Sequence, residues 1–290
     1  MKNKLKEIAK DTNIFLQKFI AKQQKTELIS AMKYGLFPGG KKIRSKVLLD
    51  IGSIFKIKYQ TLIAIGAAVE CIHAYSLIHD DLPCMDNDTL RRGKPSTHIK
   101  FGESTAVLAG NSLLTMAFEI LSSSYLKISE KSKLSLIKRL SECSGHLGIA
   151  GGQYLDLNFE KKKVSKNKII NMEVKKTGKL FSFCCSVAPI IKNRSIKEIS
   201  FFDKIGSNIG LLFQIADDII DYRGSSKIAG KKIGKDKKKG KATLISLLGY
   251  KNVIKYSENI KLRTISDLGK YNFKSKNLNE TLDYILKRNK

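Results

Sequence analysis

The chain has 290 residues, enough for one large domain or two ordinary ones and for a sizeable buried core. Its formal net charge of +28 is typical of proteins that bind nucleic acids or anionic membranes, but only 8 of its 54 basic residues are arginine. The lysines are spread over most of the length and the chain has no tryptophan, so we expect no nucleic-acid partner.

Composition also indicates the structural class. Apolar residues make up 42% of the chain, in long runs at helical spacing, and only 4 prolines are present, so we predict an all-α protein. No linker divides the chain, and residues 1–290 are expected to form one domain. The cysteines show no Cys-x-x-Cys spacing, the N-terminus lacks the apolar core of a signal peptide, and no run approaches the ~18 apolar residues of a membrane span. We therefore expect a cytoplasmic protein without a membrane span.

The first predicted helix covers residues 3–21 and is most simply a packing element. After a Pro-Gly-Gly break at residues 38–40, a new helix begins with Lys41, Lys42 and Arg44 in its first turn. Basic side chains oppose the dipole at a helix N-terminus, so their presence there predicts a bound anion. Lys41 and Arg44 are three residues apart and share a face of this helix.

Residues 69–93 contain an apolar helical run followed by a group of charged residues. This group consists of Asp80, Asp81, Asp86, Asp88, Arg91 and Arg92. Carboxylates this close repel one another unless a cation lies between them, and Mg²⁺ is the usual cation of an all-oxygen cluster. Arginines beside such a cluster would complete a phosphate site. The alternative is that these acidic residues form only a solvated helix end.

Three further helices are predicted in the middle of the chain. Residues 101–121 combine small and apolar side chains and are expected to form a core helix, and residues 131–158 are expected to form a single helix. In residues 172–191, a polar Lys176-Thr177-Gly178 step interrupts an apolar helix. Backbone carbonyls exposed at such a step could stabilise a cation.

A second acidic group lies at residues 213–222. Gln214, Asp217, Asp218 and Asp221 fall at positions i, i+3, i+4 and i+7, which places them on one helical face. The residues between them are apolar, which argues against an ordinary solvated surface. Two such helices could bind several metal ions around one diphosphate.

The order of these motifs resembles the trans-isoprenyl diphosphate synthase family, most closely its bacterial farnesyl diphosphate synthases. The resemblance rests on Asp80-Asp81-x4-Asp86, Arg91-Arg92-Gly93 and Asp217-Asp218-x2-Asp221, and runs from residue 39 to the C-terminus. It implies a bundle of about ten helices around a deep central cavity, with the two acidic helices facing each other, and a homodimer. It also implies a Mg²⁺-dependent condensation of isopentenyl diphosphate with dimethylallyl and geranyl diphosphate.

The resemblance assigns roles to individual residues. Three Mg²⁺ ions would bind Asp80, Asp86 and Asp217, with Asp81, Asp218 and Asp221 in support. Isopentenyl diphosphate would bind Lys41, Arg44, His73 and Arg92, although His73 by itself could be a core residue. The allylic diphosphate would bind Arg91 and Lys176, with Lys231 and Lys241 closing over it from the Gly- and Lys-rich loop at 223–244. Thr177 and Gln214 would face the developing carbocation.

This chain departs from the family pattern at two positions. Ser45 replaces a common proline, and Ala216 replaces the glutamine usual before the second aspartate pair. The first change touches the helix start and the second removes one polar contact, and neither removes a metal ligand.

Tyr75 is the candidate determinant of product length. It lies five residues before Asp80, roughly 7.5 Å deeper along the helix, where a phenol ring could close the floor of the cavity. In the family, an aromatic residue here together with Pro83 in the first motif accompanies short products. We therefore predict the fifteen-carbon farnesyl diphosphate, with geranyl or geranylgeranyl diphosphate as alternatives. The simpler possibility is that Tyr75 is a packed aromatic.

Two other function classes make different demands on the sequence. A terpene cyclase shares an aspartate-rich helix and Mg²⁺ but needs no second diphosphate site, so Lys41, Arg44, His73 and Arg92 argue against it. A basic nucleic-acid-binding protein would account for the charge but not for six aspartates on apolar helices, and its affinity would depend steeply on salt.

Overall fold

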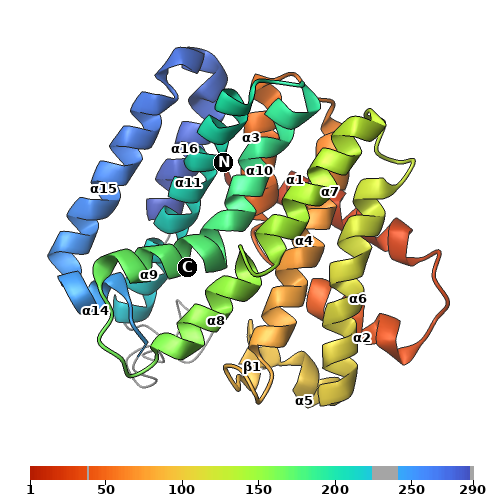
Figure 1. The fold of residues 1–290 in the computed structure, drawn as a ribbon. Coiled ribbons are helices and arrows are strands. Elements are labelled where there is room, and N and C mark those ends of the chain that lie inside the picture. The colour runs from red at the N-terminus through yellow and green to blue at the C-terminus, as the bar shows by residue number, and fades with distance from the viewer. Residues whose placement is uncertain (38, 224–240, 288–290) are drawn as a thin grey trace. The chain divides into compact units, whose positions relative to one another are not determined.

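The computed structural model describes residues 1–37, 39–223 and 241–287, and the described chain is almost entirely helical (Figure 1). The helices of its first part are α1 (Lys2–Ile20), α2 (Glu27–Leu36), α3 (Ile43–Ile54), α4 (Tyr59–Asp80), α5 (Thr97–Phe101), α6 (Glu103–Ser122) and α7 (Glu130–Ser144). Those that follow are α8 (Ile149–Phe159), α9 (Lys166–Glu173), α10 (Lys179–Ile191), α11 (Ile196–Arg223), α14 (Leu244–Leu248), α15 (Tyr250–Asp267) and α16 (Lys276–Lys287). The predicted all-α class is confirmed.

The chain divides into two compact units. The first comprises Met1–Leu49 and Ile57–Ile137, and the second comprises Asp50–Lys56 and Lys138–Lys290. The boundaries fall within α3, between α3 and α4, and within α7. That residues 1–290 act as one domain stays a prediction.

The first unit is built around α4. This helix is apolar on all sides, as expected of a core helix, and it packs most extensively against α6 and also against α1 and α2. A short antiparallel hairpin follows α4, with β1 (Leu90–Arg91) paired to β2 (Lys94–Pro95). The core of this unit therefore fixes the end of α4, from which the first acidic group emerges.

The second unit is built around α10 and α11. Nearly every side chain of α10 is buried, and the helix packs along the 28-residue α11. A π-helical turn, η1 (Val174–Gly178), joins α9 to α10, and a 3₁₀ turn, η2 (Gly269–Ser275), precedes α16. The predicted polar step at Lys176 is thus a π-turn within continuous helical chain. Such turns occur often at functional sites.

The prediction of one helix over residues 131–158 is wrong. The chain turns between α7 and α8, where the Gly148 N–H donates to the Gly145 carbonyl at 2.9 Å. A Cβ on Gly148 would lie 1.8 Å from the Cys143 carbonyl oxygen, so this turn accepts only glycine. The apolar period continues through the turn, which is why the sequence pattern missed it.

Two helices, α4 and α6, are long and apolar enough to span a membrane by length and composition alone. The most apolar stretch of α4 is 78% buried inside the protein, as expected of a core helix, whereas that of α6 is 44% buried. The sequence argument overlooked both because it sought unbroken apolar runs. The absence of a membrane span stays a prediction.

Candidate active site

The predicted anion site at the start of α3 lies in the first unit. Gly39 and Gly40 have φ of 87° and 133°, which other residues rarely adopt, and they turn the chain sharply into the helix. The Arg92 guanidinium donates to the Gly39 carbonyl and lies over Gly40, where a Cβ would approach its nitrogens to 3.0 Å. The structure thus brings Arg92 to the segment that presents Lys41, whose side chain is exposed.

Arg44 and His73 lie together in the same unit. The Arg44 Nη1 is 3.3 Å from the His73 Nε2. Burial lowers the pKa of His73 well below its ordinary value, and Arg44 and other nearby cations lower it further. His73 is therefore neutral near pH 7. Because a guanidinium can only donate, Nε2 is assigned as the acceptor and the proton lies on Nδ1.

The first acidic group folds back on itself. The Asp86 N–H donates to the Asp80 carbonyl at 2.8 Å, and the Asp88 N–H donates to the Asp81 carbonyl at 3.1 Å. These bonds return the chain to the end of α4 after Pro83. Asp80 and Asp86 keep partial exposure, whereas Asp81 and Asp88 are buried.

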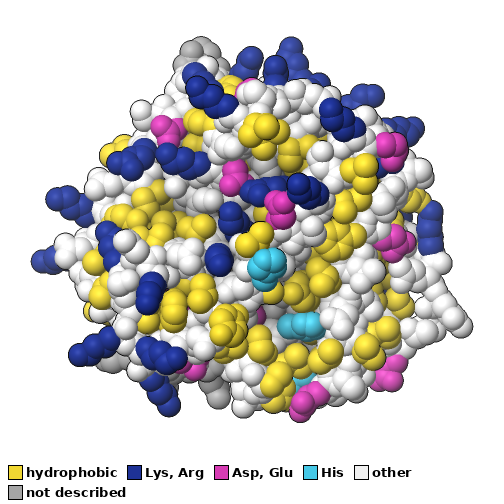
Figure 2. Space-filling view, in the orientation of Figure 1, with side chains coloured by type: hydrophobic (Ala, Val, Ile, Leu, Met, Phe, Trp, Pro, Cys, Tyr) yellow, Lys and Arg dark blue, Asp and Glu magenta, His cyan; other side chains and the backbone are white. Residues whose placement is uncertain are grey.

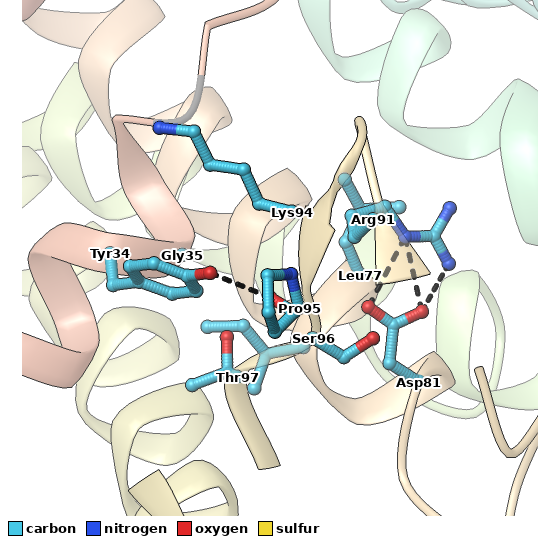
Figure 3. A pocket seen from close by; sticks show the side chains of 10 residues that line it. Tyr34, Gly35, Leu77, Asp81, Arg91, Lys94, Pro95, Ser96 and Thr97 are labelled. Atoms are coloured by element: carbon cyan, nitrogen blue, oxygen red, sulfur yellow. Dashed lines mark hydrogen bonds and ion pairs between the residues drawn. The ribbon is translucent and has the colours of Figure 1, made fainter. Parts of the chain in front are cut away.

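Asp81 is bound by Arg91 (Figure 3). The Arg91 Nε donates to the two Asp81 oxygens at 3.0 and 3.2 Å, Nη2 also contacts this carboxylate, and Asp88 lies 3.7 Å from Nη2. Burial raises the pKa of Asp81 and Arg91 opposes that rise. Asp81 and Arg91 also line a small pocket with Tyr34 and Thr97. Asp81 thus anchors the hairpin, which leaves the partly exposed Asp80 and Asp86 as the better candidates for metal binding.

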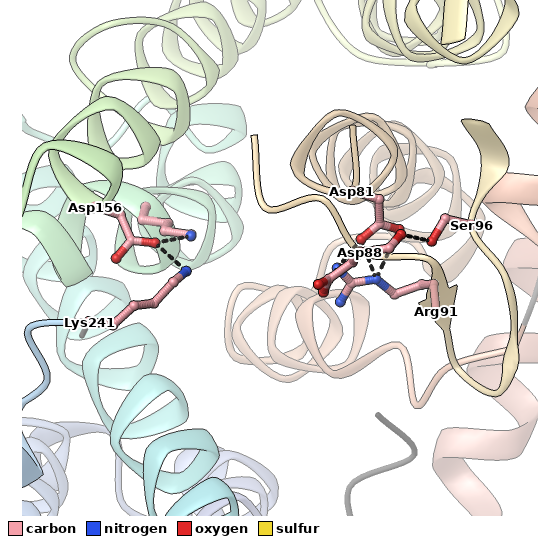
Figure 4. A network of polar contacts seen from close by, with 7 residues as sticks. Asp81, Asp88, Arg91, Ser96, Asp156 and Lys241 are labelled. Carbon is pink, nitrogen blue, oxygen red and sulfur yellow. Dashed lines mark hydrogen bonds and ion pairs between the residues drawn. The ribbon is translucent and has the colours of Figure 1, made fainter. Parts of the chain in front are cut away.

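In the second unit, Asp156 binds two lysines (Figure 4). Lys176 Nζ lies 2.6 Å and Lys241 Nζ 3.0 Å from Asp156 Oδ2. Although burial by itself would raise the pKa of Asp156, the two ammonium groups outweigh it and the pKa is lowered. The structure therefore brings together two residues predicted to bind the allylic diphosphate.

A chain of hydrogen bonds joins three more predicted residues of this unit. The Thr177 hydroxyl donates to Gln214 Oε1 at 3.0 Å, and Gln214 Nε2 donates to Asp218 Oδ1 at 2.8 Å. Gln214 and Asp218 both lie on α11, together with Asp217 and Asp221, as the helical spacing predicted. This network fixes the amide of Gln214 and the hydroxyl of Thr177 relative to the second acidic group.

Sequence reasoning missed Glu173. This residue is 3% exposed, and its Oε2 has no hydrogen-bond partner within residues 1–37, 39–223 and 241–287. Burial, together with the nearby charges of Asp218 and Asp156, raises its pKa well above the ordinary value. Its lysine-rich neighbourhood in the sequence resembles a solvated surface, so no pattern signalled a buried acid.

The donor chemistry of the two acidic groups fits Mg²⁺. All candidate ligands are carboxylates, and among the described residues no three His, Cys, Asp or Glu side chains form a ready-made metal cage. Mg²⁺ commonly keeps several waters and binds through one or two carboxylates plus substrate phosphates, so it needs no such cage.

Two predicted residues remain to be placed. Tyr75 is partly buried on α4, and its ring meets the ring of His79 edge to face with centroids 5.0 Å apart. Lys231 lies outside the described residues.

Lysine and arginine side chains are scattered over the visible face in Figure 2, in keeping with a dispersed charge excess.

Comparison with known proteins identifies the family. The polyprenyl synthetase family model matches residues 25–283. A farnesyl diphosphate synthase of Escherichia coli is 39% identical over 293 residues, covering 99% of this chain and 98% of its own length.

Solved structures agree. An FPP/GFPP synthase of Zymomonas mobilis has 34% identity and a TM-score of 0.86 over 98% of this chain and 100% of its own. A geranyltransferase of Helicobacter pylori, complexed with magnesium and isoprenyl diphosphate, has 30% identity and a TM-score of 0.81 over 97% of this chain and 95% of its own. The predicted isoprenoid synthase fold is thereby confirmed, and the chain belongs to the polyprenyl synthetase family.

Proposed function

We propose that this chain is a farnesyl diphosphate synthase. It transfers a prenyl group from dimethylallyl and then geranyl diphosphate to isopentenyl diphosphate, head to tail, and releases the fifteen-carbon product. The pairing of Arg44 with a neutral His73, at a helix start that also presents Lys41, carries the proposal. It supplies a second diphosphate site, which prenyl transfer needs and a terpene cyclase does not. The relatives named above support the choice of substrates.

The metal ligands follow from the acidic groups. Asp80, Asp86 and Asp217 would bind three Mg²⁺ ions, with Asp81, Asp218 and Asp221 in support. When bound, Mg²⁺ neutralises charge on the departing diphosphate. Asp81 acts through Arg91, which it orients by the bidentate contact.

The proposal assigns a task to each of the remaining side chains. Lys176 and Lys241, together with Lys231, bind the allylic diphosphate, and Arg91 binds it from the hairpin. The Thr177 hydroxyl donates a hydrogen bond to Gln214, so the lone pairs of its oxygen remain available to an electron-poor centre. The double bond of isopentenyl diphosphate then attacks the allylic cation, and the released diphosphate takes the final proton.

The assembly is proposed to be a homodimer in the cytoplasm. On α6, the adjacent apolar side chains of Val107 and Leu108 are 38% and 54% exposed. A second copy covering α6 would bury them. Sedimentation of the purified chain should therefore give twice the monomer mass, and replacement of Leu108 by Glu should weaken the dimer.

The two-substrate assignment is tested by Arg44→Ala. This variant should raise the KM for isopentenyl diphosphate much more than the KM for the allylic substrate, because Arg44 is assigned to one diphosphate only. Steady-state kinetics with each substrate varied in turn gives both values. Equal effects on the two KM values would contradict the assignment of Arg44, at the start of α3, to isopentenyl diphosphate.

A further inference from the structure

Glu70 is a buried carboxylate to which the proposed function assigns no task. It lies on α4, three residues before His73, and is 4% exposed. A carboxylate taken out of water costs several kcal/mol unless its oxygens are paired. The groups that pair with the Glu70 oxygens therefore indicate what this buried carboxylate does.

Both oxygens of Glu70 bind the start of α3, where Lys42 directly precedes the helix and Ser45 lies in its first turn. The Lys42 Nζ lies 3.1 Å from Oε2, and the Ser45 hydroxyl donates to Oε1 at 2.9 Å. Lys42 is 8% exposed and Ser45 is fully buried, so solvent does not compete for these contacts. Ser45 stands where the family commonly has proline, which could not donate such a bond. Glu70 thus fixes the start of α3 at two points three residues apart.

Lys42 has an unusual backbone conformation at this point. Its φ is 50°, in the left-handed region, which costs a residue with a side chain roughly 1–2 kcal/mol. Its carbonyl accepts the first bond of the helix from the Lys46 N–H at 2.9 Å. Such a conformation needs support from its surroundings, and the buried ion pair with Glu70 is one contact that supplies it.

The residues held by Glu70 alternate with those assigned to the substrate. Lys42 and Ser45 bind Glu70, whereas Lys41 and Arg44 each precede one of them by one position, and Lys41 is exposed and Arg44 partly exposed. The positive charges of Lys42, Arg44 and Arg92 are gathered near His73, and all three lower its pKa. These cations repel one another in the absence of an anionic substrate, and Glu70 offsets that repulsion.

We propose that Glu70 is a positioning residue that, through Lys42 and Ser45, sets the direction of Lys41 and Arg44 toward the diphosphate of isopentenyl diphosphate. The inference rests on the proposed function for the identity of that ligand. It predicts a defect confined to one substrate, whereas a purely structural ion pair predicts a general loss of stability and activity.

Four variants test it: Glu70→Gln, Lys42→Met, Lys42→Arg and, as an ion-pair control away from this cluster, Asp203→Asn. Asp203 pairs with Arg139 in the second unit and has no assigned role in binding. The readouts are the Kd of isopentenyl diphosphate by titration calorimetry, the KM of each substrate, and the Tm.

Glu70→Gln and Lys42→Met should each raise the Kd and KM for isopentenyl diphosphate about tenfold or more, since removing one partner leaves the other buried without compensation. The allylic KM should stay within about twofold, and the double variant should be no worse than the worse single one, because the two residues act as a pair. Lys42→Arg should restore binding. Asp203→Asn should lower the Tm and leave both KM values unchanged.

Equal rises in both KM values for Glu70→Gln, or unchanged binding of isopentenyl diphosphate, would overturn the inference while leaving the proposed function intact. If Glu70→Gln does not fold, the comparison of Lys42→Met with Lys42→Arg decides, again by the Kd and KM for isopentenyl diphosphate. A wild-type chain that neither binds isopentenyl diphosphate nor transfers a prenyl group would overturn both.

Discussion

At the scale of single residues, neighbouring carboxylates of the first acidic group have different surroundings. Asp81 is buried against Arg91, whereas Asp80 is partly exposed at the end of α4. The spacing of the aspartates could be predicted from the sequence. The different surroundings of Asp80 and Asp81 could not be predicted, because they depend on a hairpin that returns Arg91 to the end of α4.

This difference predicts different defects when each of the two adjacent aspartates is replaced. Asp80→Asn should lower kcat by orders of magnitude with the Tm nearly unchanged, because it removes a charge that binds Mg²⁺. Asp81→Asn should lower stability by about 1.5–3 kcal/mol, the cost of losing hydrogen bonds to a charged partner. Steady-state kinetics and thermal unfolding of both variants provide the comparison. A normal kcat in Asp80→Asn would contradict the metal assignment.

Glu173 makes stability depend on pH. Its pKa in the folded protein is raised well above the ordinary value of 4.5 by burial and by nearby Asp218 and Asp156. The folded state therefore binds the proton more tightly than the unfolded state, so this contribution to stability is complete below about pH 4.5 and is lost as the pH rises through the folded pKa.

Glu173→Gln cannot ionise and should lack this dependence. Between about pH 5 and pH 8 the Tm of the wild type should fall relative to that of Glu173→Gln, as measured by calorimetry across the range. Parallel Tm curves for the two proteins would show that Glu173 is ionised in the folded state.

At the scale of elements, α4 carries both Asp80, a proposed metal ligand, and Tyr75, the proposed product-length determinant. Tyr75 lies one turn before His79, whose Nε2 is 3.0 Å from the Val107 carbonyl of α6, and the two rings meet edge to face. A Cβ on Gly110 would lie 2.2 Å from that histidine nitrogen, so a side chain there would displace the His79 ring. His79 thus connects α6 with the ring of Tyr75.

Tyr75→Ala should shift the products to twenty carbons or more, because it removes the ring proposed to close the floor. Chromatography of the dephosphorylated products measures their length. Tyr59→Ala, on the first turn of the same helix with its hydroxyl bonded to Asp11, is the control and should not change the product. An active Tyr75→Ala enzyme that still stops at fifteen carbons would assign product length to another residue.

Helix α8 packs directly on the π-turn that carries Lys176 and Thr177. A Cβ on Gly152 would lie 2.1 Å from the backbone nitrogen of Lys176, so no side-chain movement can relieve the clash. Gly152→Ala should therefore cost about 1–3 kcal/mol of stability and lower kcat by displacing the turn. In Gly269→Ala, where a Cβ meets nothing within 4 Å, both should be nearly unchanged. Thermal unfolding and kinetics of the pair give the comparison.

At the scale of the whole molecule, local pattern and tertiary structure contributed different information. The helical class and the motif positions follow from apolar spacing and from aspartates at fixed intervals. The turn at Gly148 and the buried position of Glu70 do not, because the first interrupts no apolar period and the second depends on residues of another helix. The separation into two compact units likewise leaves no linker in the sequence.

The central claim is prenyl transfer to a fifteen-carbon product, and one incubation tests it most directly. The purified chain is mixed with dimethylallyl diphosphate, isopentenyl diphosphate and Mg²⁺, and the product is identified by mass spectrometry with and without a chelator. The account predicts farnesyl diphosphate as the main product, with no product in the chelator. A cyclic hydrocarbon formed from an allylic diphosphate alone, or no consumption of isopentenyl diphosphate, would contradict it.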